Sequence, residues 1–377
     1  MAAKPNILEI LAKRIIIGDG SYMNTFEKRG YVTAGLYTPE CVLEHPDAVS
    51  GLHKEFARAG ADVIQAFTFH ATDGMLQCSE SAKNYNCFGN DVHIYNVFIN
   101  HAACDLARNV ATSYNLLVCG GLSPTPTYTA GKGKAAVQAE FEKQCQVFKE
   151  KDVDFFIAEY FCSIEEMEWA IDVMKNYNKP IACTMRIGPV GCMDGISAGE
   201  CSVRMAKRGA DIVGLNCQFD YNAQLKTMKL MKDALNEAGL SQFLMMQPIG
   251  FLSPETEYLV EGYSHLPECM LAMEPRILTR WECRDYARKA YELGVRYIGG
   301  CCGFESYHIR EMSEELSEER GFRQPGKDHN LPFAAGYGQS VYEYDRQKHG
   351  RDYWMNLIPK TGRPNSAAYN SEKELIH

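Results

Sequence analysis

Three cysteines follow two apolar runs of the chain, and their types and positions suggest a metal centre. Cys217 ends the run GADIVGLNC, and Cys301 and Cys302 follow the run GVRYIGG. Three cysteine ligands with an open fourth position are typical of catalytic zinc, whereas structural sites use four protein ligands. The alternatives are buried core thiols or a vicinal redox pair.

The charge of such a centre limits its chemistry. A Zn²⁺ ion with three thiolates carries a net charge of about −1, so it is a poor Lewis acid for making hydroxide. It suits a fourth thiolate, which stays nucleophilic at neutral pH because the metal removes its proton. A metalloprotease-type H-E-x-x-H motif is absent from the sequence. We therefore predict one Zn²⁺ per subunit and alkyl transfer to a thiol.

The adjacent pair of cysteines needs unusual backbone geometry. Neighbouring residues on a regular strand point to opposite faces. Three flanking glycines can leave strand geometry, and we expect them to turn both sulfurs to one side: Gly299, Gly300 and Gly303.

Carboxylates and aromatic residues follow other apolar runs. Asp19 and Glu159 are two carboxylates that suit an ammonium group. Aromatic rings form cages for onium ions, and ordinary core packing is the alternative for each ring taken singly. The candidates for such a cage are Tyr37, Phe67, Phe69 and Tyr160.

Eight runs rich in Val, Ile, Leu and Phe must position these side chains. They begin at Arg14, Ala61, Asn115, Val153, Lys179, Gly209, Ser241 and Gly294. Near-continuous apolar runs indicate strands buried on both faces of a parallel sheet, and the segments between them have helical spacing. Eight strand–helix repeats predict a (β/α)₈ TIM barrel, with its chemistry at the C-terminal ends of the strands. A doubly wound sheet is the alternative, but no G-x-G-x-x-G follows the first strand.

Composition excludes several classes of protein. The chain has 377 residues, 46% of them hydrophobic, and a formal net charge of −9. These values argue against wholesale disorder and against a nucleic-acid partner. We expect no membrane-spanning segment and no secretory signal. The 15 cysteines include no C-x-x-C pair, so we expect reduced thiols and a cytoplasmic protein.

The composition changes near Gly321. We assign residues 1–320 to the barrel and residues 321–377 to a C-terminal arm that is rich in aromatic residues, Pro and Gly. A disordered tail would have fewer aromatic residues. We therefore expect the arm to form a subunit contact, with a wrap around its own barrel as the alternative.

Several motifs resemble betaine–homocysteine S-methyltransferases. They are GDG at Gly18, EKRGY at Glu27, HPDAV at His45, QAFTF at Gln65, AEYF at Ala158, GLNCQFD at Gly214, QP at Gln247, LGVRYIGGCCGFESYHIR at Leu293 and ERGF at Glu319. GLNC together with GGCCG is specific to the zinc-thiol homocysteine methyltransferases. The resemblance runs from about Asn6 to Phe322, with a weaker echo in the arm.

The resemblance implies direct displacement by a zinc-bound homocysteine thiolate on the methyl of betaine, giving methionine and dimethylglycine. It implies a homo-oligomer, dimer or tetramer, and zinc held by Cys217, Cys301 and Cys302. The expected homocysteine-binding residues are Asp19, Gly20, Thr68 and Glu159, of which Asp19 and Glu159 are also the catalytic candidates. The expected methyl-donor residues are Tyr37, Phe69, His70, Tyr160 and Gln247.

Two positions depart from the betaine-using branch. Tyr37 stands where that branch has Trp, and His70 stands where it has Tyr. Trp has the best cation–π face, so these changes leave open a sulfonium donor such as dimethylsulfoniopropionate or S-methylmethionine. A non-catalytic zinc-thiolate structural or sensing protein is a second alternative. A cobalamin-linked module is a third, although the arm is too short to hold a corrinoid domain.

Overall fold

The computed structural model describes residues 6–32, 39–76, 92–270 and 272–322, together with 342, 343 and 347; for residues 92–95 it describes the backbone. Eight parallel strands pair in the order β1-β8-β7-β6-β5-β4-β3-β2. The strands are β1 (Ile16–Ile17), β2 (Val63–Gln65), β3 (Leu117–Leu122), β4 (Phe155–Phe161), β5 (Ile181–Met185), β6 (Ile212–Asn216), β7 (Phe243–Gln247) and β8 (Tyr297–Ile298).

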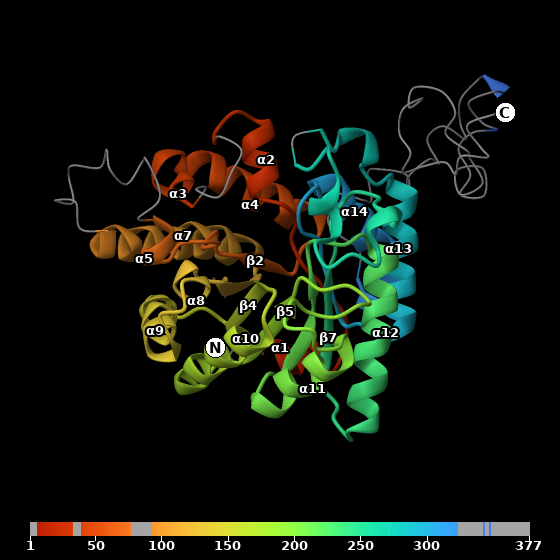
Figure 1. Cartoon of the computed structure of the whole chain (residues 1–377). Coiled ribbons are helices and arrows are strands. Elements are labelled where there is room, and N and C mark those ends of the chain that lie inside the picture. The colour runs from red at the N-terminus through yellow and green to blue at the C-terminus, as the bar shows by residue number, and fades with distance from the viewer. Residues whose placement is uncertain are drawn as a thin grey trace.

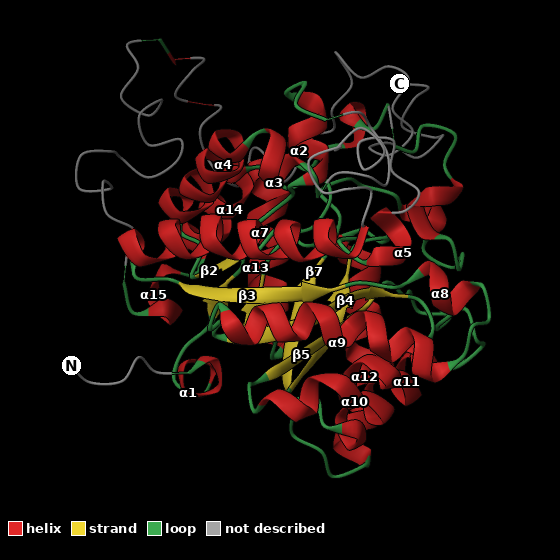
Figure 2. Cartoon of the chain, turned by 90° about the vertical axis from the view of Figure 1, so that its left-hand side faces the viewer, coloured by secondary structure: helices red, strands yellow, loops and turns green. Residues whose placement is uncertain are grey.

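A long helix follows each strand, which confirms the predicted (β/α)₈ TIM barrel. In chain order these helices are α4 (Pro46–Ala59), α7 (Val92–Tyr114), α9 (Lys134–Glu150), α10 (Ile164–Met174), α11 (Ala198–Arg208), α12 (Tyr221–Glu237), α13 (Arg280–Leu293) and α14 (Ser306–Glu315). They surround the strands in Figures 1 and 2. Gly209, Gly239 and Gly294 follow the ends of α11, α12 and α13, and their positive φ values of 124°, 68° and 103° suit residues that terminate helices.

Shorter elements lie between the repeats and at the ends of the barrel. The short α-helices are α1 (Ile7–Leu11), α2 (Met23–Lys28), α3 (Cys41–Glu44), α5 (Asp73–Leu76), α8 (Pro126–Thr129) and α15 (Ser317–Arg320). The 3₁₀ helices are η2 (Lys175–Tyr177), η3 (Pro254–Thr256), η4 (Gly262–His265) and η5 (Glu274–Arg276).

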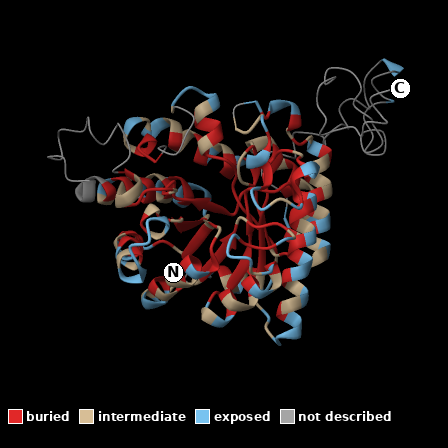
Figure 3. Ribbon diagram, in the orientation of Figure 1, coloured by how far each residue is buried: buried red, intermediate tan, exposed pale blue. Residues whose placement is uncertain are grey.

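The strands are buried on both faces, as the apolar runs predict (Figure 3). Ile16 points into the barrel, where it packs with inward residues of the other strands, and Ile17 packs against the outer helices. Ile7 and Leu11 of α1 join the inner cluster. This two-sided burial holds the eight strand ends, and therefore the site residues, in one rigid frame.

Asp62 links β1 to β2, the two strands that do not pair directly. Its backbone N–H donates to the Ile17 carbonyl at 2.7 Å, and its Oδ2 accepts the Ile17 N–H at 2.8 Å. Oδ2 also lies 3.1 Å from Nη2 of the buried Arg320, and Oδ1 lies 3.1 Å from Arg14. A carboxylate and two arginines therefore close the barrel where a strand ladder is missing.

Two predictions fall on residues that the structure does not describe. Tyr37 lies outside the described residues, and so does most of the segment 321–377. The expected oligomerisation arm therefore stays a prediction. Among the described helices, none is long and apolar enough to cross a membrane.

We predict that Asp62→Ala lowers the free energy of unfolding by about 3 kcal/mol, because it leaves the Arg320 guanidinium buried without its carboxylate. Asp233→Ala is the control, since it breaks an exposed ion pair with Lys229 and should cost less than about 0.5 kcal/mol. Urea unfolding followed by circular dichroism measures both values. Equal losses in the two variants would show that Asp62 does not close the barrel.

Candidate active site

Cys217 lies in a sharp turn directly after β6. Cys217 and Gln218 both adopt left-handed backbone conformations, with φ of 57° and 64°. The Cys217 N–H donates to the Gln247 carbonyl at 2.8 Å, and its carbonyl accepts from Nε2 of Gln224 at 2.9 Å. Non-glycine residues rarely adopt this conformation, so these bonds hold a strained turn that directs the sulfur inward.

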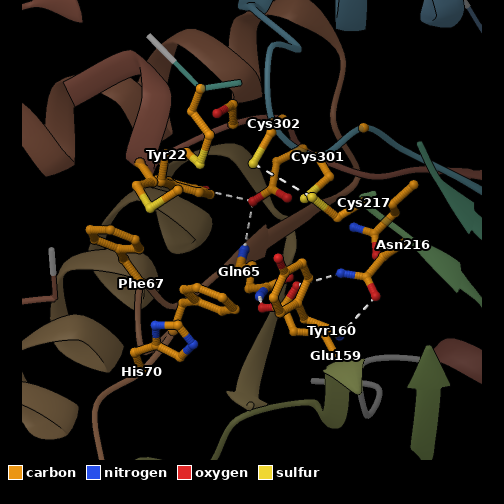
Figure 4. Close-up of a pocket in the computed structure, with 18 of the residues that line it drawn as sticks. Tyr22, Gln65, Phe67, His70, Glu159, Tyr160, Asn216, Cys217, Cys301 and Cys302 are labelled. Atoms are coloured by element: carbon orange, nitrogen blue, oxygen red, sulfur yellow. Dashed lines mark hydrogen bonds between the residues drawn. The ribbon is translucent and has the colours of Figure 1, made fainter. Parts of the chain in front are cut away.

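Cys301 and Cys302 lie in the loop after β8 and reach the same place from the other side. The Cys301 N–H donates to the Pro248 carbonyl at 2.8 Å, and the Cys302 carbonyl accepts from Gly250 at 2.7 Å. These bonds attach the pair to the segment after β7. Both sulfurs point to one side, as predicted (Figure 4).

The glycines around this pair act differently from the sequence expectation. Only Gly303 of the three has a positive φ, at 85°. Gly300 provides space, because a Cβ there would lie 2.1 Å from Cγ of Phe304. Gly299 is also crowded, with its Cβ position 3.2 Å from Cα of Gly18. Gly303 is therefore required for its backbone conformation, whereas Gly299 and Gly300 are required because there is no space for a side chain.

The three sulfurs form a group that fits one metal ion. They lie within 4.8 Å of one another, and the Cys217 and Cys302 sulfurs are 3.6 Å apart. Tetrahedral zinc with sulfurs at about 2.3 Å requires sulfur–sulfur distances of about 3.8 Å. Hydrogen bonds from Cys301 and then Cys302 lower the pKa of Cys217 well below its ordinary value, while the same bonds raise the pKa values of the donors. Cys217 is therefore the thiol of the group that loses its proton first, while Cys301 and Cys302 keep theirs.

Asp19 and Glu159 face the same cavity as the thiols. Asp19 Oδ2 accepts from the Gln65 N–H at 2.8 Å and from the Tyr22 hydroxyl at 2.5 Å. Glu159 Oε1 accepts from the Gln65 side-chain amide, and Oε2 accepts from Asn216 Nδ2 at 3.3 Å. Gln65 therefore holds both carboxylates, one through its backbone and one through its side chain.

Burial makes both carboxylates reluctant to ionise. Desolvation raises the pKa of Asp19 to about 6, although its hydrogen bonds act in the opposite direction. Desolvation raises the pKa of Glu159 to about 8, and the nearby Asp19 and Cys217 add to the increase. A cation between the two carboxylates would favour their charged forms. An ammonium group supplies such a cation.

An irregularity in β4 directs Glu159 and Tyr160 into the cavity. The pairing of β4 with β5 shifts register between Ala158 and Phe161. Tyr160 adopts a φ of 67°, and its N–H donates to Asn216 Oδ1 at 2.8 Å. A regular strand would point these two neighbours to opposite faces, so the irregularity is what brings both to the site.

The cavity between these residues has a volume of about 170 Å³. Phe69 and Tyr160 form an edge-to-face pair on its wall, with ring centroids 5.5 Å apart. Phe67 lies against Tyr22 in a stacked arrangement, also at 5.5 Å. Most predicted site residues line the cavity: Asp19, Gly20, Phe69, His70, Glu159, Tyr160, Cys217, Gln247, Cys301 and Cys302.

Three polar residues that the sequence predicts at the site differ in their placement. Thr68 is fully buried but does not line the cavity, and its hydroxyl donates to the Gly121 carbonyl at 2.8 Å. His70 lines the wall with its ring stacked on Phe69 at 3.9 Å and has a φ of 59°. Gln247 lines the floor, and its buried Oε1 receives no hydrogen bond from the described residues.

Sequence reasoning assigned no role to several residues that shape the cavity. Gln65 and Asn216 position the carboxylates, and Tyr22, Tyr263 and Met270 line the wall. Gln65 and Asn216 each end a strand, which is the one local signal that marks them. Their partners lie 94 and 57 residues away in sequence, so only the folded barrel reveals them.

We predict that Glu159→Gln stabilises the metal-free protein increasingly as pH rises. The folded protein holds a proton on Glu159 up to a pKa of about 8, above the unfolded value, so its stability contribution is lost as pH rises through that pKa. Between about pH 5 and about pH 8.5 the variant should gain on the order of 3 kcal/mol in unfolding free energy relative to the parent. Urea unfolding at both pH values measures the gain, with the exposed Glu237→Gln as control. A pH-independent difference would contradict the assignment.

Comparison with known proteins agrees with this geometry. A family model described as homocysteine S-methyltransferase matches residues 16–316. Betaine–homocysteine S-methyltransferase 1 of Xenopus tropicalis is 48% identical over 363 residues, covering 96% of this chain and 88% of that protein. The S-methylmethionine–homocysteine S-methyltransferase BHMT2 of Pongo abelii is 47% identical, covering 96% of this chain and 95% of that protein.

A solved structure has the same fold. The metallated form of the homocysteine methyltransferase MmuM from Escherichia coli superposes with a TM-score of 0.60 at 18% identity, covering 79% of this chain and 95% of that one. At this identity the likeness shows the fold alone, whereas the family model and the nearly full-length relatives show the family. The chain is an enzyme of the homocysteine S-methyltransferase family.

Proposed function

We propose that the protein transfers a methyl group from betaine to homocysteine, giving methionine and dimethylglycine, with one zinc ion per subunit. The observation that carries this proposal is the convergence of three cysteine sulfurs with two buried carboxylates on one cavity. The relatives named as betaine–homocysteine S-methyltransferases, at 46–48% identity, support the choice of donor.

Homocysteine would occupy the side of the cavity between the thiols and the carboxylates. Cys217, Cys301 and Cys302 would hold zinc and leave its fourth position to the substrate sulfur. When bound, the zinc lowers the pKa of the homocysteine thiol and keeps its sulfur nucleophilic. Asp19 and Glu159 would bind the substrate ammonium group, which favours their charged forms.

The donor would occupy the aromatic side of the cavity. Phe69 and Tyr160 present ring surfaces that attract an onium ion, and Tyr37 is proposed to complete the cage. His70 and Gln247 would contact the remaining polar part of the donor. Such a wall holds the onium carbon behind its methyl group, and the fixed approach of donor and thiolate supplies much of the rate.

The reaction itself needs little from acid–base groups. The sulfur electron pair forms the new bond to the methyl carbon, and the carbon–nitrogen bond breaks with its electrons going to the amine. No general base acts at the methyl carbon. One proton leaves when the thiol binds, and Glu159 or water would accept it.

A sulfonium donor is the second candidate. A relative named for S-methylmethionine is as similar to this chain as the relatives named for betaine. His70 in the cavity wall and Tyr37 are the two cage positions at which we expect the choice between ammonium and sulfonium to be made.

The first test supplies betaine, dimethylsulfoniopropionate and S-methylmethionine separately to the reduced, zinc-loaded protein and measures methionine. Turnover with betaine is the expected result. Turnover with a sulfonium alone would replace the donor and keep the rest of the proposal. A zinc-loaded protein that turns over none of them would contradict the proposal and favour a structural or sensing role for the thiol group.

We predict that Cys217→Ser and Cys301→Ser lose zinc and methyl transfer together. Removing a ligand should exceed the ~10–100-fold losses typical of groups that merely support ligands. Cys162→Ser is the control, because this cysteine follows β4 but lies outside the thiol group. Zinc is measured by mass spectrometry and activity as methionine formed. Retention of zinc with full turnover in either ligand variant would remove that residue from the site.

A further inference from the structure

We propose that Tyr22 and His53 act as positioning residues that hold Asp19 ready for the ammonium group of homocysteine. This inference deepens the proposed function and rests on it, because it takes Asp19 as an ammonium-binding residue. Neither residue entered the sequence-based assignment of the site. Both are seen only when the barrel brings α4 and the start of α2 to the end of β1.

Tyr22 lies in the cavity wall directly before α2 and meets Asp19. Its hydroxyl is 2.5 Å from Asp19 Oδ2, and its side chain is buried. Phe67 stacks on its ring and Phe56 packs edge-on, each with a centroid distance of 5.5 Å. The ring is therefore fixed, and the hydroxyl oxygen cannot move away from the carboxylate without repacking both aromatic neighbours.

His53 lies behind Tyr22 on α4. Its Nδ1 is 3.0 Å from the Tyr22 hydroxyl oxygen, and its ring packs edge-on against Tyr22 at 5.2 Å. The side chain is fully buried, and its Nε2 has no hydrogen-bond partner among the described residues. Burial lowers the pKa of His53 to about 3, so the imidazole is neutral and carries one N–H proton.

Counting protons fixes the direction of the hydrogen bonds. The Tyr22 hydroxyl has one proton, and an ionised Asp19 carboxylate can only accept. The two oxygens are only 2.5 Å apart, a contact that needs a proton between them, so the Tyr22 proton points to Asp19 Oδ2 and His53 donates from Nδ1 to the Tyr22 oxygen. The result is a directed chain from His53 through Tyr22 to Asp19.

The chain orients Asp19 and favours its ionised form. The Tyr22 hydroxyl and the Gln65 N–H both donate to Oδ2, so we assign the ammonium contact to Oδ1. Hydrogen bonds between successive polar groups polarise one another in a low-dielectric interior, so His53 strengthens the donor that Tyr22 presents. A carboxylate held in this way needs less reorganisation when the substrate cation arrives.

The test compares homocysteine with 4-mercaptobutanoate, which has the same thiol and carboxylate but no amine. Binding to the zinc-loaded protein is measured by isothermal titration calorimetry. We expect the parent to bind homocysteine more tightly. Tyr22→Phe keeps the ring but removes the hydroxyl, and should weaken homocysteine binding about tenfold or more while 4-mercaptobutanoate binding stays unchanged.

Tyr221→Phe is the matched control. Tyr221 is also a buried tyrosine with its hydroxyl directed to a carboxylate, Asp285 Oδ2 at 3.3 Å, but it lies outside the cavity. It should leave both affinities unchanged. If the parent does not discriminate between the two thiols, the ammonium site fails and the inference with it. If the parent discriminates and Tyr22→Phe keeps the full preference, this inference alone fails.

A second measurement needs neither zinc nor substrate. Nitrogen-15 spectra of the imidazole groups distinguish Nδ1–H from Nε2–H, and loss of a signal in His53→Asn assigns His53. We expect the neutral Nδ1–H form in the parent. The Nε2–H form would overturn the proposed chain, because the Tyr22 proton would then point to His53 and away from Asp19.

Discussion

The concentration of acidic groups in one buried cavity is the constraint on which the rest of the site depends. Three thiols and two carboxylates meet there, and burial raises the pKa of Asp19 to about 6 and that of Glu159 to about 8. Burial disfavours the charged forms of these groups, so they need cations beside them to be charged together. A metal ion among the sulfurs and an ammonium group between the carboxylates meet this demand together, which is why the two proposed binding events belong to one site.

Local irregularities in the backbone of the barrel make this arrangement possible. Left-handed residues follow β6, a register shift interrupts β4, and Gly303 turns the chain after β8. Each irregularity is held by hydrogen bonds to a neighbouring strand end, such as that from the Cys217 N–H to the Gln247 carbonyl. Strain of this kind persists only where its surroundings are rigid, and the two-sided burial of the strands supplies that rigidity.

Amide side chains connect the two halves of the site. Gln65 joins Asp19 to Glu159, and Asn216 joins Glu159 to the backbone of Tyr160, which lies in the aromatic wall. The residues proposed for the acceptor and those proposed for the donor are therefore coupled through β4 and β6. A change at one amide is expected to disturb both substrates, whereas Tyr22 and His53 contact the Asp19 side alone.

The sequence by itself determined the barrel and the thiol group. Continuous apolar runs predict buried parallel strands. The C-terminal ends of such strands lie at one rim of a barrel irrespective of the loop sequences, so Cys217, Cys301 and Cys302 could be placed together. Tertiary structure decided which polar atoms meet. The Thr68 hydroxyl donates a hydrogen bond to the Gly121 carbonyl. The Tyr22 hydroxyl lies within hydrogen-bonding distance of both Asp19 and His53, although Tyr22 and His53 are 31 residues apart. Hydrogen-bond partners depend on ångström-scale geometry between separate elements, and periodicity along one chain does not carry that information.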